Sequence, residues 1–360
     1  MTLSPALRVA AVHAAPVFLD AARSVARACD LIAEAARHGA RLVVFPETYI
    51  PAFPIWAAVR APIHNHDLFR RLVANSLRVD GPEMALLRAT ARNHAIIVSM
   101  GFSEGTEASV GCIWNANVLI GADGAILNHH RKLVPTFYEK LVWANGDGAG
   151  LRVSATPIGR IGMLICGENT NPLARYTLIA QGEQIHLASY PPVWPTRDPR
   201  AGGNYDLRGA IRIRAGAHSF EAKAFTVVAS GYLDQASLDA VGDLDPDTRD
   251  ILERTPRGAS MVMAPTGEPV GEELCESEGI LYAGIDLAAC VEPKQFHDVA
   301  GGYNRFDVFD LRVDRTARRP VTFRDDAGRD AAGPADAGPG LPDGDPAGAA
   351  GGAVPAARRP

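Results

Sequence analysis

The sequence predicts a mixed α/β sandwich, with two central β-sheets between helices, followed by a disordered C-terminal tail. Strand–helix–strand patterns alternate with hairpins in both halves of the chain, which is typical of sheets covered by helices. More than ten strands are expected. A single open sheet rarely holds so many strands, so two sheets are predicted. Residues 331–360 contain 10 Ala, 7 Gly and 6 Pro and no aromatic residue, too little apolar surface to offset the entropy of ordering. We expect one domain over 1–317 and a tail over 318–360.

The N-terminal half is predicted from hydrophobic periodicity. Apolar residues recur at helical spacing between Ser24 and His38, and Gly39 suits the helix C-cap. Continuous apolar runs indicate strands that are buried on both faces. In chain order, we expect a strand at 7–17, a helix at 24–38, a strand at 41–46, helices at 66–77 and 83–93, a strand at 95–103, and a hairpin within 112–132.

The C-terminal half repeats this alternation. Asn171 and Pro172 form a helix start signal, with Asn as N-cap and Pro at the first helical position. The charge-rich insert 234–254 is expected to be a solvated surface loop or a surface contact. In chain order, we expect a strand or strand pair at 156–166, a helix to about residue 181, a strand at 184–191, a helix at 204–223, a strand at 224–231, and a second hairpin-like pair from strands within 258–270 and 279–287.

Composition excludes several classes of protein. The formal net charge is −5 with no long basic run, so nucleic acid is not an expected partner. No apolar stretch has the length of a membrane span, and the N-terminus lacks the pattern of a secretory signal. The five cysteines are scattered and form no C-x-x-C pair, which argues against zinc and disulfides. We therefore expect a cytoplasmic protein that binds no membrane.

Three residues with reactive or charged side chains each stand at the end of an expected strand: Glu47, Lys132 and Cys166. Each has an ordinary alternative, as a turn residue, a solvated charge and a small core residue respectively. Sites in open α/β sheets lie at the carboxyl ends of strands, where several such ends converge. Taken together, the three residues indicate a cysteine nucleophile with a carboxylate and a cation beside it.

The local sequences around these residues carry a family resemblance. FPETYIPAFPIW (45–56), HHRKLVPTFYEKLVWANGDG (129–148) and CGENTNPLARYTLIAQGEQIHLASYPP (166–192) resemble the nitrilase branch of the carbon–nitrogen hydrolases, and the likeness extends over about 5–313. The resemblance implies an α-β-β-α sandwich of two mixed β-sheets flanked by helices. It also implies Glu47 as base, Lys132 as cation, Cys166 as nucleophile and Glu139 as the second glutamate of the lysine segment.

These residue types suit attack on a nitrile carbon. A thiolate is a better nucleophile than an alcohol, and a carboxylate can take its proton and later activate water. Lys132 and the Gly167 N–H would stabilise the charge that develops on nitrogen. The products would be a carboxylic acid and ammonia, and the chemistry needs no metal or organic cofactor.

Two other activities and one binding role remain open. An amidase, or a nitrile-hydrating relative such as a cyanide hydratase, would use the same triad. A non-catalytic interaction protein could keep the fold, but the intact Glu, Lys and Cys argue against it. Glu139 could instead be a charge on a helix surface. Glu168 could hold the turn after Cys166 or act directly in catalysis.

Aromatic and apolar residues near the strand ends are candidates for the substrate pocket, with core or subunit contact as the alternative. The resemblance favours the positions just after Tyr-Pro-Pro. It also implies self-association as dimers that extend into spiral homo-oligomers. The predicted pocket residues are Tyr49, Trp56, Tyr190, Val193 and Trp194.

Overall fold

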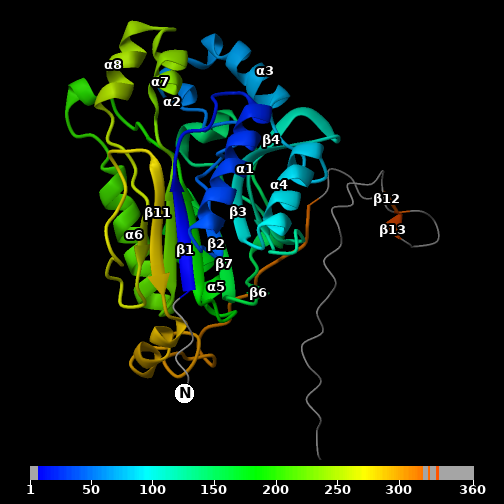
Figure 1. The fold of residues 1–360 in the computed structure, drawn as a ribbon, viewed down its shortest axis with the longest axis vertical. Coiled ribbons are helices and arrows are strands. Elements are labelled where there is room, and N and C mark those ends of the chain that lie inside the picture. Colours follow the sequence, from blue (N-terminus) through cyan, green and yellow to red (C-terminus); the bar gives the residue numbers. More distant parts are fainter. Residues whose placement is uncertain (1–6, 319–322, 325–329, 332–360) are drawn as a thin grey trace, which may run out of the picture.

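The computed structural model describes residues 7–318, 323–324 and 330–331 (Figure 1). Two mixed sheets pack face to face between helices, which confirms the predicted fold class. Most of the predicted tail, 318–360, lies outside the described residues. Within it, the two-residue strands β12 (Phe323–Arg324) and β13 (Asp330–Ala331) pair antiparallel.

The first sheet has six strands in the order β11-β1-β2-β3-β4-β5. Its three central strands β1, β2 and β3 are parallel, and β4 and β5 continue from β3 as an antiparallel meander. The hairpin predicted within 112–132 is therefore confirmed. The strands are β1 (Leu7–His13), β2 (Leu42–Val44), β3 (Ile97–Thr106), β4 (Ser109–Ile120), β5 (Ile126–Arg131) and β11 (Gly279–Ile285).

The second sheet has five strands in the order β10-β9-β8-β7-β6. Its central strands β7, β8 and β9 are parallel and buried, while β6 and β10 pair antiparallel at the two edges. The strands are β6 (Ser154–Thr156), β7 (Gly159–Ile165), β8 (Ile185–Tyr190), β9 (Phe225–Ser230) and β10 (Met261–Met263).

Helices cover the outer face of each sheet (Figure 1). Helices α1 and α4 pack on the first sheet, α5 and α6 pack on the second, and a separate apolar cluster fills the space between the sheets. Asn171 caps α5 as predicted, with its side chain accepting from Leu173 N. The helices are α1 (Ala21–Arg37), α2 (Trp56–Val59), α3 (His66–Ala74), α4 (Pro82–Asn93), α5 (Pro172–Ile179), α6 (Leu207–Ala222), α7 (Gln235–Gly242) and α8 (Pro246–Arg254).

Two predictions about the C-terminal half were wrong. The expected hairpin-like pair is not a pair, because β10 lies beside β9 in the second sheet and β11 lies beside β1 in the first. The insert 234–254 is not a loop, because it forms helices α7 and α8. These helices bury Leu238, Val241 and Leu252 in an apolar cluster, so the insert adds to the core.

The direction of the strands determines where a site can form. β1 begins near the N-terminus at the lower end of Figure 1, so its carboxyl end points toward α2, α3, α7 and α8 at the upper end. The Glu47 N–H donates to the Tyr190 carbonyl oxygen at 3.3 Å, which joins the segment after β2 to the end of β8. The carboxyl ends of β2 in the first sheet and β8 in the second thus lie close together. No helix in the described part of the chain has both the length and the apolar character needed to cross a membrane.

Candidate active site

The three residues predicted from the strand ends lie together in the interior, with a fourth beside them. Lys132 Nζ is 2.8 Å from Glu47 Oε1 and 2.6 Å from Glu139 Oε2. Cys166 Sγ and one carboxylate oxygen from each glutamate all lie within 4.8 Å of one another. None of the three charged side chains is exposed. Glu47 and Lys132 are neighbours, as predicted from the strand ends, because β5 runs in the same direction as β2.

Lys132 is a buried cation between two carboxylates. Burial alone would lower the pKa of its ammonium group, but the charges of Glu139 and Glu47 raise that pKa well above the ordinary value. The ammonium group occupies the position where a metal ion bridging the two carboxylates would lie. It follows that these carboxylates hold a lysine rather than a metal.

Glu139 is fixed by three different donors. Its Oε2 accepts from Lys132 Nζ and from the Thr136 N–H at 3.0 Å, and its Oε1 accepts from Trp194 Nε1 at 3.3 Å. It lies in the short 3₁₀ helix η2 (Phe137–Leu141) and forms a capping box with Thr136. Because its side chain is fully buried, the alternative of a charge on a helix surface is excluded.

Only one of the two carboxylate oxygens of Glu47 accepts hydrogen bonds from the described residues. Its Oε1 accepts from Lys132 Nζ and from Asn115 Nδ2 at 2.7 Å. Its Oε2 is buried and has no hydrogen-bond partner among the described residues. Burial raises the pKa of this carboxyl group to about 7 and the charge of Glu139 adds to the rise, although Lys132 and Asn115 oppose it. A carboxylate with this pKa is suited to accept and return a proton near neutral pH.

Cys166 begins a sharp turn directly after β7. Its backbone has a φ of 48°, in the left-handed region that residues other than glycine rarely adopt, and it starts the 3₁₀ helix η4 (Cys166–Thr170). Burial and the charge of Glu47 raise the pKa of its thiol well above the ordinary value, against the effect of Lys132. At rest the residue is therefore a thiol, and attack requires a base.

Gly167 follows the cysteine in a place that has no room for a side chain. A Cβ atom there would lie 2.7 Å from Thr136 Oγ1. The turn after β7 and the segment of Glu139 are therefore in close contact. The Gly167 N–H belongs to the first turn of η4, where backbone N–H groups have no partner within the helix.

Glu168 joins the cysteine segment to the lysine segment. Its Oε1 accepts from the Leu133 N–H at 2.7 Å, its Oε2 accepts from the Ile165 N–H at 2.8 Å, and His130 Nε2 lies 2.9 Å away. Burial would raise the pKa of Glu168, but His130 and the two N–H groups lower it. Both oxygens of this carboxylate have hydrogen-bond partners that join the two strand ends. This favours a structural role over a catalytic one.

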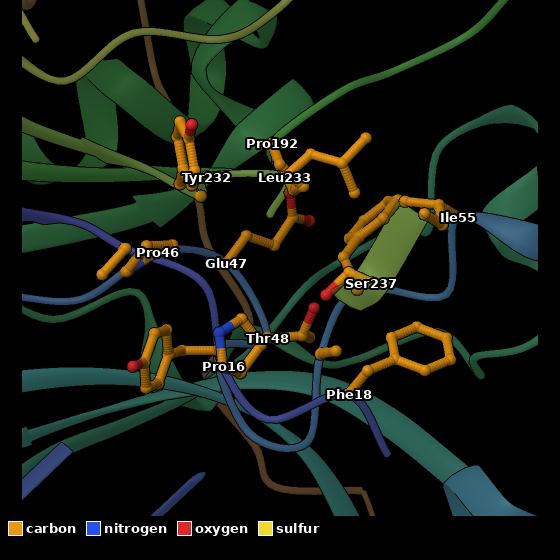
Figure 2. A pocket seen from close by; sticks show the side chains of 15 residues that line it. Pro16, Phe18, Pro46, Glu47, Thr48, Ile55, Pro192, Tyr232, Leu233 and Ser237 are labelled. Atoms are coloured by element: carbon orange, nitrogen blue, oxygen red, sulfur yellow. The ribbon is translucent and has the colours of Figure 1, made fainter. Parts of the chain in front are cut away.

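A small cavity of about 20 Å³, with room for about one water molecule, lies beside Glu47 (Figure 2), and Cys166 is not among the residues that line it. Its walls are mostly apolar and come from the segments that follow β1, β2, β8 and β9, with one residue from α7. Among the predicted pocket residues, Tyr49 lines this cavity. The side chains that Figure 2 labels are Pro16, Phe18, Pro46, Glu47, Thr48, Ile55, Pro192, Tyr232, Leu233 and Ser237.

The other predicted pocket residues lie in different surroundings. Trp56 and Val193 are buried in the apolar cluster that also holds residues of α7 and α8. Tyr190 is fully buried in the same cluster as Cys166, and its hydroxyl has no partner among the described residues. Trp194 is partly exposed, donates to Glu139 and stacks near Tyr138, with ring centroids 5.7 Å apart. Trp194 is thus the member of this group with a direct contact to the charged cluster.

Sequence reasoning missed Asn115, His130 and Tyr138. Asn115 could have been found from the predicted hairpin, because extending its register past Ala116 and Arg131 places Asn115 opposite Lys132. Tyr138 is buried, and the nearby charges of Glu139, Cys166 and Glu47 add to burial in raising its pKa well above the ordinary value. His130 alternates with partly buried neighbours on an edge strand, and no local pattern marked its contact with Glu168.

Comparison with known proteins identifies the family of the chain. The family model described as carbon-nitrogen hydrolase matches residues 8–295. An arylacetonitrilase from Hypocrea virens is 36% identical over 88% of this chain and 94% of its own length, and a nitrilase from Paraburkholderia phymatum is 34% identical over 88% of each chain. The crystal structure of a carbon-nitrogen hydrolase from Helicobacter pylori G27 superposes with a TM-score of 0.62 at 20% identity, covering 80% of this chain and 92% of that one. The chain belongs to the carbon-nitrogen hydrolase family.

Proposed function

We propose that the protein is a nitrilase, which hydrolyses an organic nitrile to a carboxylic acid and ammonia. The observation that carries this proposal is the buried Lys132 cation held between Glu47 and Glu139, with the Cys166 thiol within reach of both carboxylates. The relatives that match along nearly the whole chain carry the names arylacetonitrilase and nitrilase.

In the proposed reaction, the free oxygen of Glu47 takes the thiol proton as Cys166 Sγ attacks the nitrile carbon. The proton passes to the nitrile nitrogen and gives a thioimidate. Lys132 and the Gly167 N–H stabilise the developing negative charge. Glu47 then activates a water molecule, ammonia leaves, and a thioester remains. A second water molecule releases the carboxylic acid and regenerates the thiol.

We expect a nitrile with an aromatic group. Relatives that match along nearly the whole chain carry the name arylacetonitrilase, and aromatic side chains lie near Glu47, which suits an aryl group. The test is a panel of aliphatic, aromatic and arylaceto nitriles, with ammonia, acid and amide measured separately. The proposal predicts acid and ammonia in equal amounts from an arylacetonitrile. Amide as the main product would favour a hydratase, and turnover of amides alone would favour an amidase.

The rate should fall on the acid side of about pH 7. Glu47 must be ionised to act as the base, and its pKa is raised to about 7. As the pH falls through this value the carboxyl group takes up a proton, so kcat/KM should fall about tenfold per pH unit. Asn115→Ala removes a hydrogen bond that favours the ionised form, so this variant should move the acid limb to higher pH. A limb near the ordinary pKa of glutamate in the unmodified enzyme would contradict this role.

Replacing Glu139 with glutamine should lower kcat by about a hundredfold, the typical cost of losing one electrostatic contact in a transition state. Glutamine keeps the shape of the side chain but removes the charge that holds Lys132 protonated and in place. The matched control is Glu107→Gln, because the Glu107 side chain is 72% exposed. Equal kcat values for the two variants would show that the Glu139 charge has no part in turnover.

We also propose that the protein self-associates. Large apolar side chains are exposed on the outer helices and on the segment after β11, where they line a wide hollow beside α5. Exposed apolar surface of this kind marks contact surfaces between proteins. A second copy of the chain is the partner we propose, through Leu173, Ile213, Phe220, Tyr303, Phe306 and Phe309.

Light scattering after size exclusion tests this contact. Phe309→Asp should lower the molar mass of the assembly, because it puts a charge where the proposed contact is apolar. Val110→Asp is the control, since Val110 is 96% exposed near the turn between β3 and β4. A monomeric unmodified protein, or equal masses for the two variants, would contradict this contact.

We propose a cytoplasmic location because all five cysteines are free in the structure and free thiols persist in reducing compartments. Recovery of the enzyme in the membrane or extracellular fraction of expressing cells would contradict it.

A further inference from the structure

A second cluster of buried ionisable groups lies behind the turn that carries Cys166. It consists of Glu183 before β8, His186 on β8 and His218 on α6, and all three side chains are fully buried. His186 Nδ1 is 2.5 Å from Glu183 Oε1, and His218 Nε2 is 3.0 Å from Glu183 Oε2. Burying such groups costs free energy, and the proposed reaction uses none of them directly.

Asn169 connects this cluster to the cysteine. Its Nδ2 donates to the carbonyl oxygens of Cys166 at 3.0 Å and Leu164 at 3.3 Å. Both of these backbone groups are acceptors, so the orientation of the amide is fixed. Its Oδ1 therefore faces His186 Nε2, at 2.7 Å.

The hydrogen bonds determine the protons on the two histidines. His186 Nε2 must carry a hydrogen because Asn169 Oδ1 can only accept. Burial would raise the pKa of Glu183, but the two histidines lower it to about 2, so its carboxylate also only accepts. His186 thus lies between the Asn169 amide oxygen, to which its Nε2 donates, and the Glu183 carboxylate, which its Nδ1 faces. Burial and the nearby His186 lower the pKa of His218 to about 4, so His218 is neutral and its Nδ1 has no partner among the described residues.

The same contacts argue against a metal ion in this cluster. One ligand atom from each of Glu183, His186 and His218 lies within 4.8 Å of the others. The separations of 2.5 and 3.0 Å between them are those of hydrogen bonds. The His186 and His218 rings are tilted by 30°, with centroids 3.8 Å apart, and both histidines face the Glu183 carboxylate.

We propose that Glu183, His186 and Asn169 form a positioning relay that holds the Cys166 turn in its left-handed conformation. A residue at a φ of 48° is strained, and it keeps that conformation only where its surroundings impose it. The contacts from Glu183 through His186 to the Asn169 amide form a chain, and hydrogen bonds in a chain polarise and reinforce one another. The amide then holds the carbonyl groups on both sides of the turn, so that Sγ stays beside Glu47. The relay extends the proposed function, on which it rests.

Two substitutions of one residue separate this role from a purely structural one. In His186→Gln the side-chain amide can reach the position of Nε2 and still donate to Asn169. In His186→Asn it can reach the position of Nδ1 and still donate to Glu183, but the link to Asn169 is lost. We expect His186→Asn to lower kcat about a hundredfold, the usual cost of a nucleophile displaced by about 1 Å, with KM changed less than threefold. His186→Gln should lower kcat less than tenfold.

A variant at the other end of the relay covers the case in which His186→Asn fails to fold. Asn169→Ala leaves the Glu183–His186 pair intact and removes the clamp on the turn. It should also lower kcat about a hundredfold. In the absence of substrate, it should slow alkylation of Cys166 by iodoacetamide at least tenfold, because the thiol is no longer held beside its base.

The outcomes distinguish failure of the relay from failure of the nitrilase proposal. If the unmodified enzyme hydrolyses amides but not nitriles, the same kcat comparison is made with an amide, because the relay acts on Cys166 whichever bond is attacked. His186→Gln being more damaging than His186→Asn would overturn the relay, as would normal kcat and alkylation in Asn169→Ala. One equivalent of tightly bound metal that is lost in His186→Asn would overturn it as well, by making the cluster a metal site.

Discussion

Replacing Cys166 with alanine should abolish nitrile turnover and leave the fold intact. In the proposed reaction this thiol forms the covalent bond, and no other cysteine among the described residues lies beside Glu47 and Glu139. Loss of a nucleophile of this kind lowers kcat by about 10⁴-fold or more. Because the change removes a single sulfur atom, the free energy of unfolding should change by about 1 kcal/mol, as for an average point mutation. Ammonia release and circular dichroism check the two parts.

The matched control is Cys29→Ala. Cys29 lies on α1 and contacts Thr90, on the outer face of the first sheet. Alkylation or truncation of this thiol should leave kcat and KM unchanged. Substantial nitrile hydrolysis by a correctly folded Cys166→Ala enzyme would remove the basis of the proposed reaction.

Replacing Lys132 with alanine should also lower activity strongly, though less than loss of Cys166, and should be more damaging to stability. The developing charge on nitrogen loses a donor, which lowers kcat by about 10²–10³-fold. The two carboxylates also lose the cation that separates them, so the pKa of Glu47 should rise further and less of the base is ionised at neutral pH. Breaking a buried ion pair costs about 3–5 kcal/mol of unfolding free energy, which chemical denaturation would detect.

Two further substitutions isolate the charge of Lys132. Lys132→Met keeps most of the side-chain volume, so it should be more stable than Lys132→Ala but equally inactive. Lys140→Ala is the control, because Lys140 is an exposed residue of the same short helix and should keep full activity. An active Lys132→Met enzyme would show that the cation is not needed for turnover.

The fold class and the charged cluster could be predicted because they depend on local patterns. Glu47, Lys132 and Cys166 each follow a strand, and their strands end at the same edge of the molecule. Glu139 followed only from the family resemblance. The pairing of β10 and β11 could not be predicted, because an apolar strand pattern does not identify its partner. β11 pairs with β1, although almost the whole sequence of the domain separates the two strands.

The contacts that position the site residues could not be predicted from the sequence either. His186 and Asn169 lie 17 positions apart, and their hydrogen bond depends on the packing of η4 against β8. The many charged residues of the insert predict a loop where the structure has the helices α7 and α8. Their few apolar residues, including Leu238 and Val241, are the ones that pack beside Trp56 and Val193. In both cases the deciding interaction joins elements that no local pattern connects.

The central claim is that Cys166 attacks the nitrile carbon. It is tested most directly by stopping turnover of an arylacetonitrile with acid and measuring peptide masses. The account predicts that the peptide containing Cys166 gains the mass of the nitrile or of the corresponding acyl group, and that Cys166→Ala gains neither. Attachment of the substrate to any other peptide, or full nitrile turnover with no peptide modified at any time, would contradict it.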